Sequence, residues 1–76
     1  MDENSSWAIK TSKQLAEFFR SERKKKKISM STLATFANVS REAVDDFENQ
    51  RKDIRLSTLL RLLKFCNLEL IIQIRK

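Results

Sequence analysis

The sequence contains no glycine, no proline and no histidine, and it has a single cysteine, Cys66. Without glycine it has neither a P-loop nor a dinucleotide-binding fingerprint, because both need backbone in close approach to phosphate. Without histidine it has no His-based acid–base pair and no zincin site. One cysteine forms neither an intrachain disulfide nor a zinc cluster. These absences argue against an enzyme and predict no cofactor and no metal site.

Long apolar runs are also missing. No stretch approaches the ~20 apolar residues that a membrane span needs, and the acidic start, with Asp2 and Glu3, does not resemble a signal peptide. The 76 residues are enough for one domain with a thin core, which often depends on a second copy or a partner. We therefore expect a single-domain protein of the cytoplasm, associated with the nucleoid if it binds DNA.

Positive charge is in excess but unevenly distributed. The net charge is +6. Residues 20–27 hold six basic residues and one acidic residue, whereas residues 41–53 hold three basic and five acidic ones. The basic excess indicates a polyanionic partner, and nucleic acid is the first candidate. A run of lysines also occurs at an exposed helix end in contact only with solvent. The run alone therefore does not distinguish a nucleic-acid contact from such a helix end.

Capping residues and apolar spacing predict four helices, over 12–25, 30–37, 41–49 and 58–66. Thr11 and Gln14 fit a capping box before the first, and Ser29, Ser40 and Ser57 precede the others. Asn38 and Asn67 are placed to end helices in the left-handed conformation. The apolar positions of the four helices are Leu15, Phe18, Phe19, Leu33, Ala34, Ala37, Ala43, Val44, Phe47, Leu59, Leu62, Leu63 and Cys66. Phe36 is the aromatic residue most suited to face outward and touch a partner.

The last stretch changes from a helical period to a period of two. Leu68, Leu70, Ile72 and Ile74 fall on one face, which predicts a β-strand. A lone strand has an unpaired edge, so the predicted partner is the same strand of a second copy, in a two-stranded ribbon of a homodimer. Continuation of the fourth helix, or pairing with residues 7–11, are the alternatives. The chain then divides into a flexible segment (1–10), a helical domain (11–67) and a dimerising strand (68–76).

Two short capped helices joined at Asn38 form a helix-turn-helix signature. From Ser29 to Asn49 the sequence is SMSTLATFANVSREAVDDFEN. This stretch resembles the lambda-repressor-like, or XRE-type, helix-turn-helix family. The matches at gapless spacing are Leu33, Ala34, Val39, Ser40, Val44, Phe47, Glu48 and Asn49. The resemblance implies a mainly α fold, with four to five helices over about residues 12–67, followed by the dimerising strand.

Three further stretches are similar to the HipB-type antitoxins of HipA-like kinase toxins, namely Lys13 to Ala16, Phe47 to Asn49, and Leu68 to Leu70. That group dimerises through its C-terminal strand. The resemblance implies a sequence-specific repressor of its own operon, with double-stranded operator DNA, a second copy and a HipA-like toxin as partners. A generic XRE-family regulator and a protein-interaction module with weak DNA binding remain as alternatives. Trp7 would dock on the dimer or a toxin, or be disordered.

The resemblance also implies roles for individual residues. Base contacts would come from the recognition helix, at Ser40, Arg41, Glu42, Asp45 and Asp46. Phosphate contacts would come from Lys24, Lys25, Lys26, Lys27, Ser29, Ser31, Asn49, Arg51 and Lys52. A structural ion pair would join Arg23 to Glu48, and the dimer contacts would be Leu68, Leu70, Ile72 and Ile74.

The predicted recognition helix departs from its family by being acidic, since three of its five outward positions carry a carboxylate. Carboxylates oppose DNA binding because affinity comes mainly from phosphate neutralisation. Asp45 lies four residues after Arg41 and could orient it toward a guanine, and Glu42 or Asp46 could accept from a cytosine amino group. A second departure is Met30, which replaces a glutamine that normally contacts phosphate.

Overall fold

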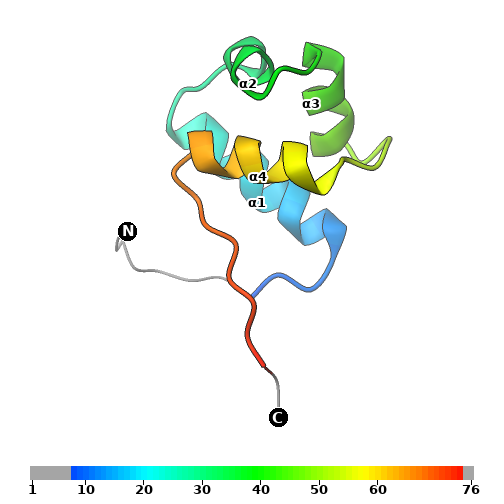
Figure 1. The fold of residues 1–76 in the computed structure, drawn as a ribbon, viewed down its shortest axis with the longest axis vertical. Helices are drawn as coiled ribbons and strands as arrows, with labels where there is room; N and C mark the ends of the chain where they lie inside the picture. The colour runs from blue at the N-terminus through cyan, green and yellow to red at the C-terminus, as the bar shows by residue number, and fades with distance from the viewer. Residues whose placement is uncertain (1–7, 75–76) are drawn as a thin grey trace.

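The computed structural model describes residues 8–74, which contain four helices (Figure 1). They are α1 (Ser12–Lys25), α2 (Met30–Ala37), α3 (Arg41–Glu48) and α4 (Leu56–Phe65). Helix α2 packs on both α3 and α4, and α1 packs on α3. The predicted mainly α class is confirmed. Trp7 and the rest of residues 1–7 of the predicted flexible segment lie outside the described residues, as do residues 75–76 of the predicted strand.

Three of the helices begin at the caps that the sequence predicts. The hydroxyl oxygens of Thr11, Ser29 and Ser40 each accept a bond of 3.1 Å from the backbone N–H three residues later. At α1 the reciprocal bond of the capping box is shifted by one residue, since the Gln14 side chain accepts from the N–H of Lys10 at 2.7 Å. These bonds satisfy amides that a helix start leaves without partners.

Helix α4 begins earlier than predicted. Ser57 was expected to cap a helix over 58–66, but the N-cap is Arg55, whose side chain makes no capping bond. The N–H of Leu59 bonds to the carbonyl of Arg55 at 2.9 Å, so the first turn forms two residues sooner. This start lets Thr58 be buried against the core while Ser57 stays exposed. Helix α3 ends one residue earlier than predicted, at Glu48, and Asn49 is its C-cap.

Each helix is followed by a residue in the left-handed conformation, although the chain has no glycine. These residues are Lys27, Asn38, Gln50 and Asn67, with φ between 56° and 58°. In every case the next N–H bonds back to the carbonyl five residues before it, at 2.8–3.1 Å. This 6→1 bond defines the Schellman motif. The two asparagines were predicted from the sequence, whereas the left-handed Gln50 was not.

The core lies where the four helices meet and is centred on Phe19, Leu33, Val44, Leu62 and Cys66, all with 0% exposure. The rings of Phe19 and Phe47 meet edge to face, with centroids 5.4 Å apart, and so join α1 to α3. Most predicted apolar positions belong to this core. Leu15, Phe18 and Ala43 are half-buried instead, and Ala16, which the sequence reasoning did not single out, is buried in the core.

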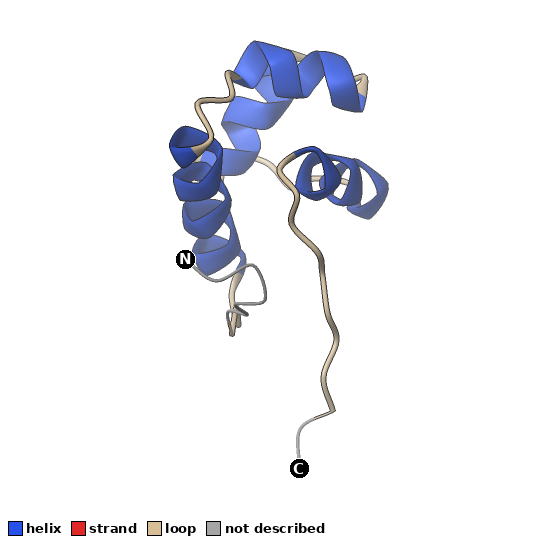
Figure 2. Ribbon diagram, turned by 90° about the vertical axis from the view of Figure 1, so that its left-hand side faces the viewer, coloured by secondary structure: helices blue, strands red, loops and turns tan. Residues whose placement is uncertain are grey.

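The C-terminal segment leaves α4 and extends away from the helices (Figures 1 and 2). Leu68 still packs on the core, but the exposed fraction rises to 90% at Ile72 and 92% at Ile74. Residues 68–74 pair with no other described residue as a strand. Helix α4 ends at Phe65, so the alternative of a helix continuing to the C-terminus is wrong. A ribbon between subunits forms only when the strand of a second copy pairs with this one, so in a single chain the ribbon stays a prediction.

Candidate nucleic-acid interface

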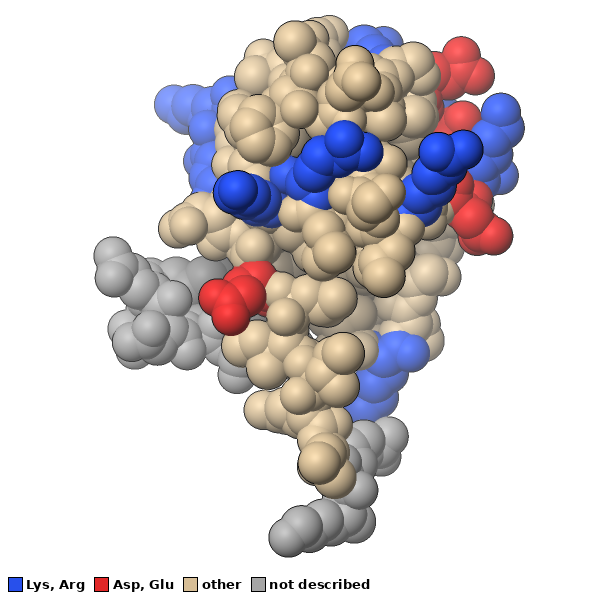
Figure 3. All heavy atoms as spheres, viewed as in Figure 1, with Lys and Arg blue, Asp and Glu red and all other residues tan. Residues whose placement is uncertain are grey.

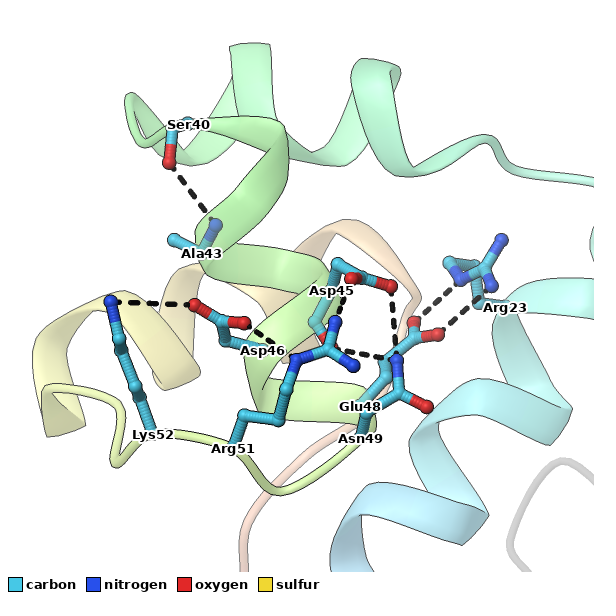
Figure 4. Close-up of polar contacts among 9 residues, drawn as sticks. All are labelled: Arg23, Ser40, Ala43, Asp45, Asp46, Glu48, Asn49, Arg51 and Lys52. Atoms are coloured by element: carbon cyan, nitrogen blue, oxygen red, sulfur yellow. Dashed lines mark hydrogen bonds and ion pairs between the residues drawn. The ribbon is translucent and has the colours of Figure 1, made fainter.

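The start of α3 is the exposed part of the helix-turn-helix. Asn38 turns the chain between α2 and α3, and buried Val44 fixes the inner side of α3. On the outer side, Ser40, Arg41 and Glu42 are exposed. The Ser40 hydroxyl caps the helix by accepting from the N–H of Ala43 (Figure 4). Within the described part of the chain neither Arg41 nor Glu42 forms an ion pair, so both side chains are available to a ligand.

The second half of α3 is arranged differently from the prediction. Asp46 was expected to face outward, but it is buried at 8% exposure. Asp45 is half-exposed, and its carboxylate bonds to Asn49 and Arg51 and forms no ion pair with Arg41. In both cases the carboxylate is paired with a cation from the loop after α3, Arg51 for Asp45 and Arg51 with Lys52 for Asp46 (Figure 4).

This loop holds both aspartates in a charge network. Arg51 Nε donates to Asp46 Oδ1 at 3.0 Å, and the same guanidinium pairs with the Asp45 carboxylate. Lys52 Nζ lies 3.8 Å from Asp46 Oδ2, and Asn49 Nδ2 donates to Asp45 Oδ1 at 2.9 Å. The hydrogen bond to Asp46 and the charge of Asp45 raise the pKa of Arg51. We call Asn49, Arg51, Lys52 and the two aspartates the loop clamp.

A second ion pair is buried between α1 and α3. Arg23 Nε donates to Glu48 Oε2 at 2.6 Å and Nη2 donates to Oε1 at 2.9 Å. The remaining Nη1 donates to the Ile28 carbonyl at 2.9 Å. The hydrogen bond with Glu48 is the main cause that raises the pKa of Arg23. This two-bond geometry fixes the end of α3 against α1 and the turn that leads to α2.

The basic run of residues 24–27 is exposed but not uniformly free. Lys25 and Lys26 approach Glu22, at 3.2 Å and 3.8 Å, and Lys26 also donates to the Cys66 carbonyl. Lys24 and Lys27 are in no ion pair among the described residues. The run leads directly into the start of α2, where Ser31 is exposed and the Ser29 hydroxyl is occupied by its capping bond. A helix start next to cations suits a phosphate.

The charges of α3 therefore nearly cancel in the folded chain. Of the five acidic residues in 41–53, Glu48 pairs with Arg23, and Asp45 and Asp46 belong to the loop clamp. Figure 3 shows acidic and basic side chains intermixed on the side of the molecule where α3 lies. Asn49, Arg51 and Lys52 were predicted to contact phosphates, and their contacts with the aspartates of α3 were not predicted. The only signal in the sequence is that these residues follow their aspartate partners by four to six positions. That spacing indicates a contact only once the turn at Gln50 is known.

Comparison with known proteins identifies the class of this fold and site. Residues 19–72 match the Helix-turn-helix family model HTH_3. The chain thus belongs to the XRE-like helix-turn-helix family of DNA-binding regulators. No curated protein matches the sequence.

Among solved structures, similar folds include HipB in complex with an O4 20mer and the HipA–HipB–O2–O3 complex, each at 22% identity. Their TM-scores are 0.82 and 0.83, and each match covers 93% of this chain and 100% of the other. A HipB variant bound to an O2 20mer gives a TM-score of 0.83 over 95% of this chain and 100% of the other, again at 22% identity. The fold of this chain is thus similar to that of HipB along almost its full length. None of the described helices is long and apolar enough to cross a membrane.

Proposed function

We propose that this chain is a sequence-specific DNA-binding repressor that acts as the antitoxin component of a HipA-like toxin–antitoxin operon and represses that operon. The observation that carries the DNA-binding part is the exposed start of α3, where Ser40, Arg41 and Glu42 project from the second helix of the helix-turn-helix. A helix in this position enters the major groove with its N-terminal residues on the base edges. Arg41 is suited to a guanine, which offers two acceptors to a guanidinium.

Phosphate contacts would surround this helix. Lys24 and Lys27 are exposed cations without an ion-pair partner in residues 8–74, and Ser31 lies in the first turn of α2. Such contacts set the register of the protein on the duplex. In a homodimer joined by residues 68–74, the two copies of α3 would lie about 34 Å apart, one turn of DNA. The operator would then be a near-palindrome.

Two observations support the antitoxin part. The fold is similar to that of HipB structures, one of which is a complex of HipA with HipB. The C-terminal segment carries exposed Leu70, Ile72 and Ile74 in the alternation expected of a dimerising strand. A generic XRE-family repressor would share the DNA-binding site but have no kinase partner.

Removal of Arg41 tests the recognition helix. Arg41→Ala should weaken binding to the operator by about 1–3 kcal/mol, or roughly fivefold to 150-fold, and relax specificity at one base pair of each half-site. Gel shifts on DNA from the promoter region of the chain's own gene measure this. Arg61→Ala is the matched control, because Arg61 is an exposed arginine on α4 outside the site. Equal binding by Arg41→Ala and wild type would overturn the assignment of α3.

The antitoxin role has a separate test. A HipA-like kinase encoded beside this chain should co-purify with it, and the complex should still bind the operator fragment. A chain that binds its operator but no such kinase would be a generic XRE-family repressor. The protein-interaction alternative, in which an acidic α3 binds a basic surface, is less favoured because the loop clamp already supplies cations to Asp45 and Asp46.

A further inference from the structure

The position of Asp45 and Asp46 poses a problem for a helix that reads DNA. Asp45 follows Arg41 by four residues and Asp46 follows Glu42 by four, so each lies on the same side of α3 as its exposed predecessor. Two uncompensated carboxylates at this place would repel the phosphates on either side of the groove. The Asp45 side chain is 32% exposed, so its charge is not removed by burial alone.

The loop after α3 is built to supply the missing cation. Gln50 adopts a φ of 56°, and the N–H of Arg51 bonds to the Asp46 carbonyl at 2.8 Å. This turn reverses the chain and directs Arg51 back along α3. Its guanidinium then reaches one carboxylate through Nε and the other through Nη2 (Figure 4). A lysine has a single charged nitrogen and could not reach both from this place with the same fork.

We propose that Arg51 is a positioning residue for DNA recognition, which neutralises Asp45 and Asp46 so that the start of α3 can enter the major groove. The role assigned to Arg51 is thus exerted through the two aspartates and not through a phosphate. This inference rests on the proposed DNA-binding function. It also assigns Asp45 and Asp46 to the support of α3 instead of to base contacts.

A double-mutant cycle separates the two roles of Arg51. The probe is a duplex selected by the wild-type protein from a library of random-sequence duplexes, with a scrambled duplex as reference. Binding is measured for wild type, Arg51→Ala, the pair Asp45→Asn with Asp46→Asn, and all three changes together. If Arg51 acts through the aspartates, Arg51→Ala should weaken binding about tenfold in the wild-type background and about twofold or less in the Asn background.

Controls keep the result independent of folding and of overall charge. Circular dichroism and urea unfolding of each variant show whether it is folded at the temperature of the binding measurement, and Arg51→Gln replaces Arg51→Ala if the latter is not. Arg61→Ala removes the same charge from α4 and should change binding by less than about twofold in both backgrounds. An equal loss on Arg51→Ala in both backgrounds would overturn the proposal and make Arg51 an independent phosphate contact. If the wild type selects no sequence, the proposed function itself fails.

Discussion

At the scale of single residues, the Arg23–Glu48 pair is a buried link of two hydrogen bonds between α1 and α3. Both groups are buried, so removal of one leaves the other charge without a partner. We expect Arg23→Ala to lower the free energy of unfolding by about 3–5 kcal/mol, which urea denaturation can measure. Replacing both residues with methionine should recover most of that loss. The control is Lys25→Ala, which removes the exposed partner of Glu22 and should change stability by less than about 1 kcal/mol.

Cys66 gives a prediction about pH. Burial raises the pKa of its thiol, although the charges of Lys26 and Arg23 oppose this. The unfolded chain therefore loses the thiol proton at a lower pH than the folded chain does. The resulting loss of stability begins as pH rises through the ordinary thiol pKa, and it is complete once pH has passed the raised one. Urea midpoints of wild type should thus fall more steeply with alkaline pH than those of Cys66→Ala. If the urea midpoints of the two proteins fell equally with pH, the result would contradict a raised pKa of the Cys66 thiol.

At the scale of elements, the four residues in the left-handed conformation after the helices lower the stability of the fold, because each carries a Cβ. Glycine at these positions would avoid this loss of stability. A left-handed conformation costs a residue with a Cβ roughly 1–2 kcal/mol, and asparagine is the residue that tolerates it best. Gln50→Gly should therefore stabilise the chain by about 0.5–1 kcal/mol in thermal or urea unfolding. Glu17→Gly, at an exposed position inside α1, should instead destabilise it by about 1 kcal/mol. If Gln50→Gly destabilised the chain as Glu17→Gly does, the result would contradict a left-handed backbone at Gln50.

The elements also show how far the sequence could be interpreted alone. The starts of α1, α2 and α3 were predictable because a capping serine or threonine acts on an amide three residues away. The start of α4 was not, because it has no side-chain cap and Ser57 offered a better local signal. The loop clamp was not predicted, because Arg51 reaches Asp45 and Asp46 only through the turn at Gln50, and no local sequence pattern indicates that turn.

At the scale of the whole molecule, the C-terminal segment is extended and has no strand partner among the described residues. Leu70, Ile72 and Ile74 share one side in the expected strand, and all three are exposed. A two-stranded ribbon between copies would pair the strand edges and bring these side chains together. In the predicted dimer, a partner chain would supply the hydrogen bonds of the strand edge. This would explain why the alternation predicts a strand that the described residues of one chain do not form.

Substitution at neighbouring positions of this segment tests the ribbon. Ile72→Asp should turn a dimer into a monomer in sedimentation velocity, because it places charges opposite one another on the apolar side. Gln73→Asp adds the same charge on the other side and should leave the dimer largely intact. Dissociation should also weaken operator binding, since only one half-site is then held. A wild-type protein that sediments as a monomer at micromolar concentration would contradict the homodimer.

The central claim is that α3 reads DNA while cations around it hold the phosphates. Its most direct test is the affinity of the wild-type protein for a selected duplex and for a scrambled one, measured by fluorescence anisotropy over a range of salt concentrations. We predict tighter binding to the selected duplex, with log affinity falling against log salt by about 0.9 for each phosphate contact. Equal affinity for both duplexes, or an affinity that salt does not change, would contradict the claim.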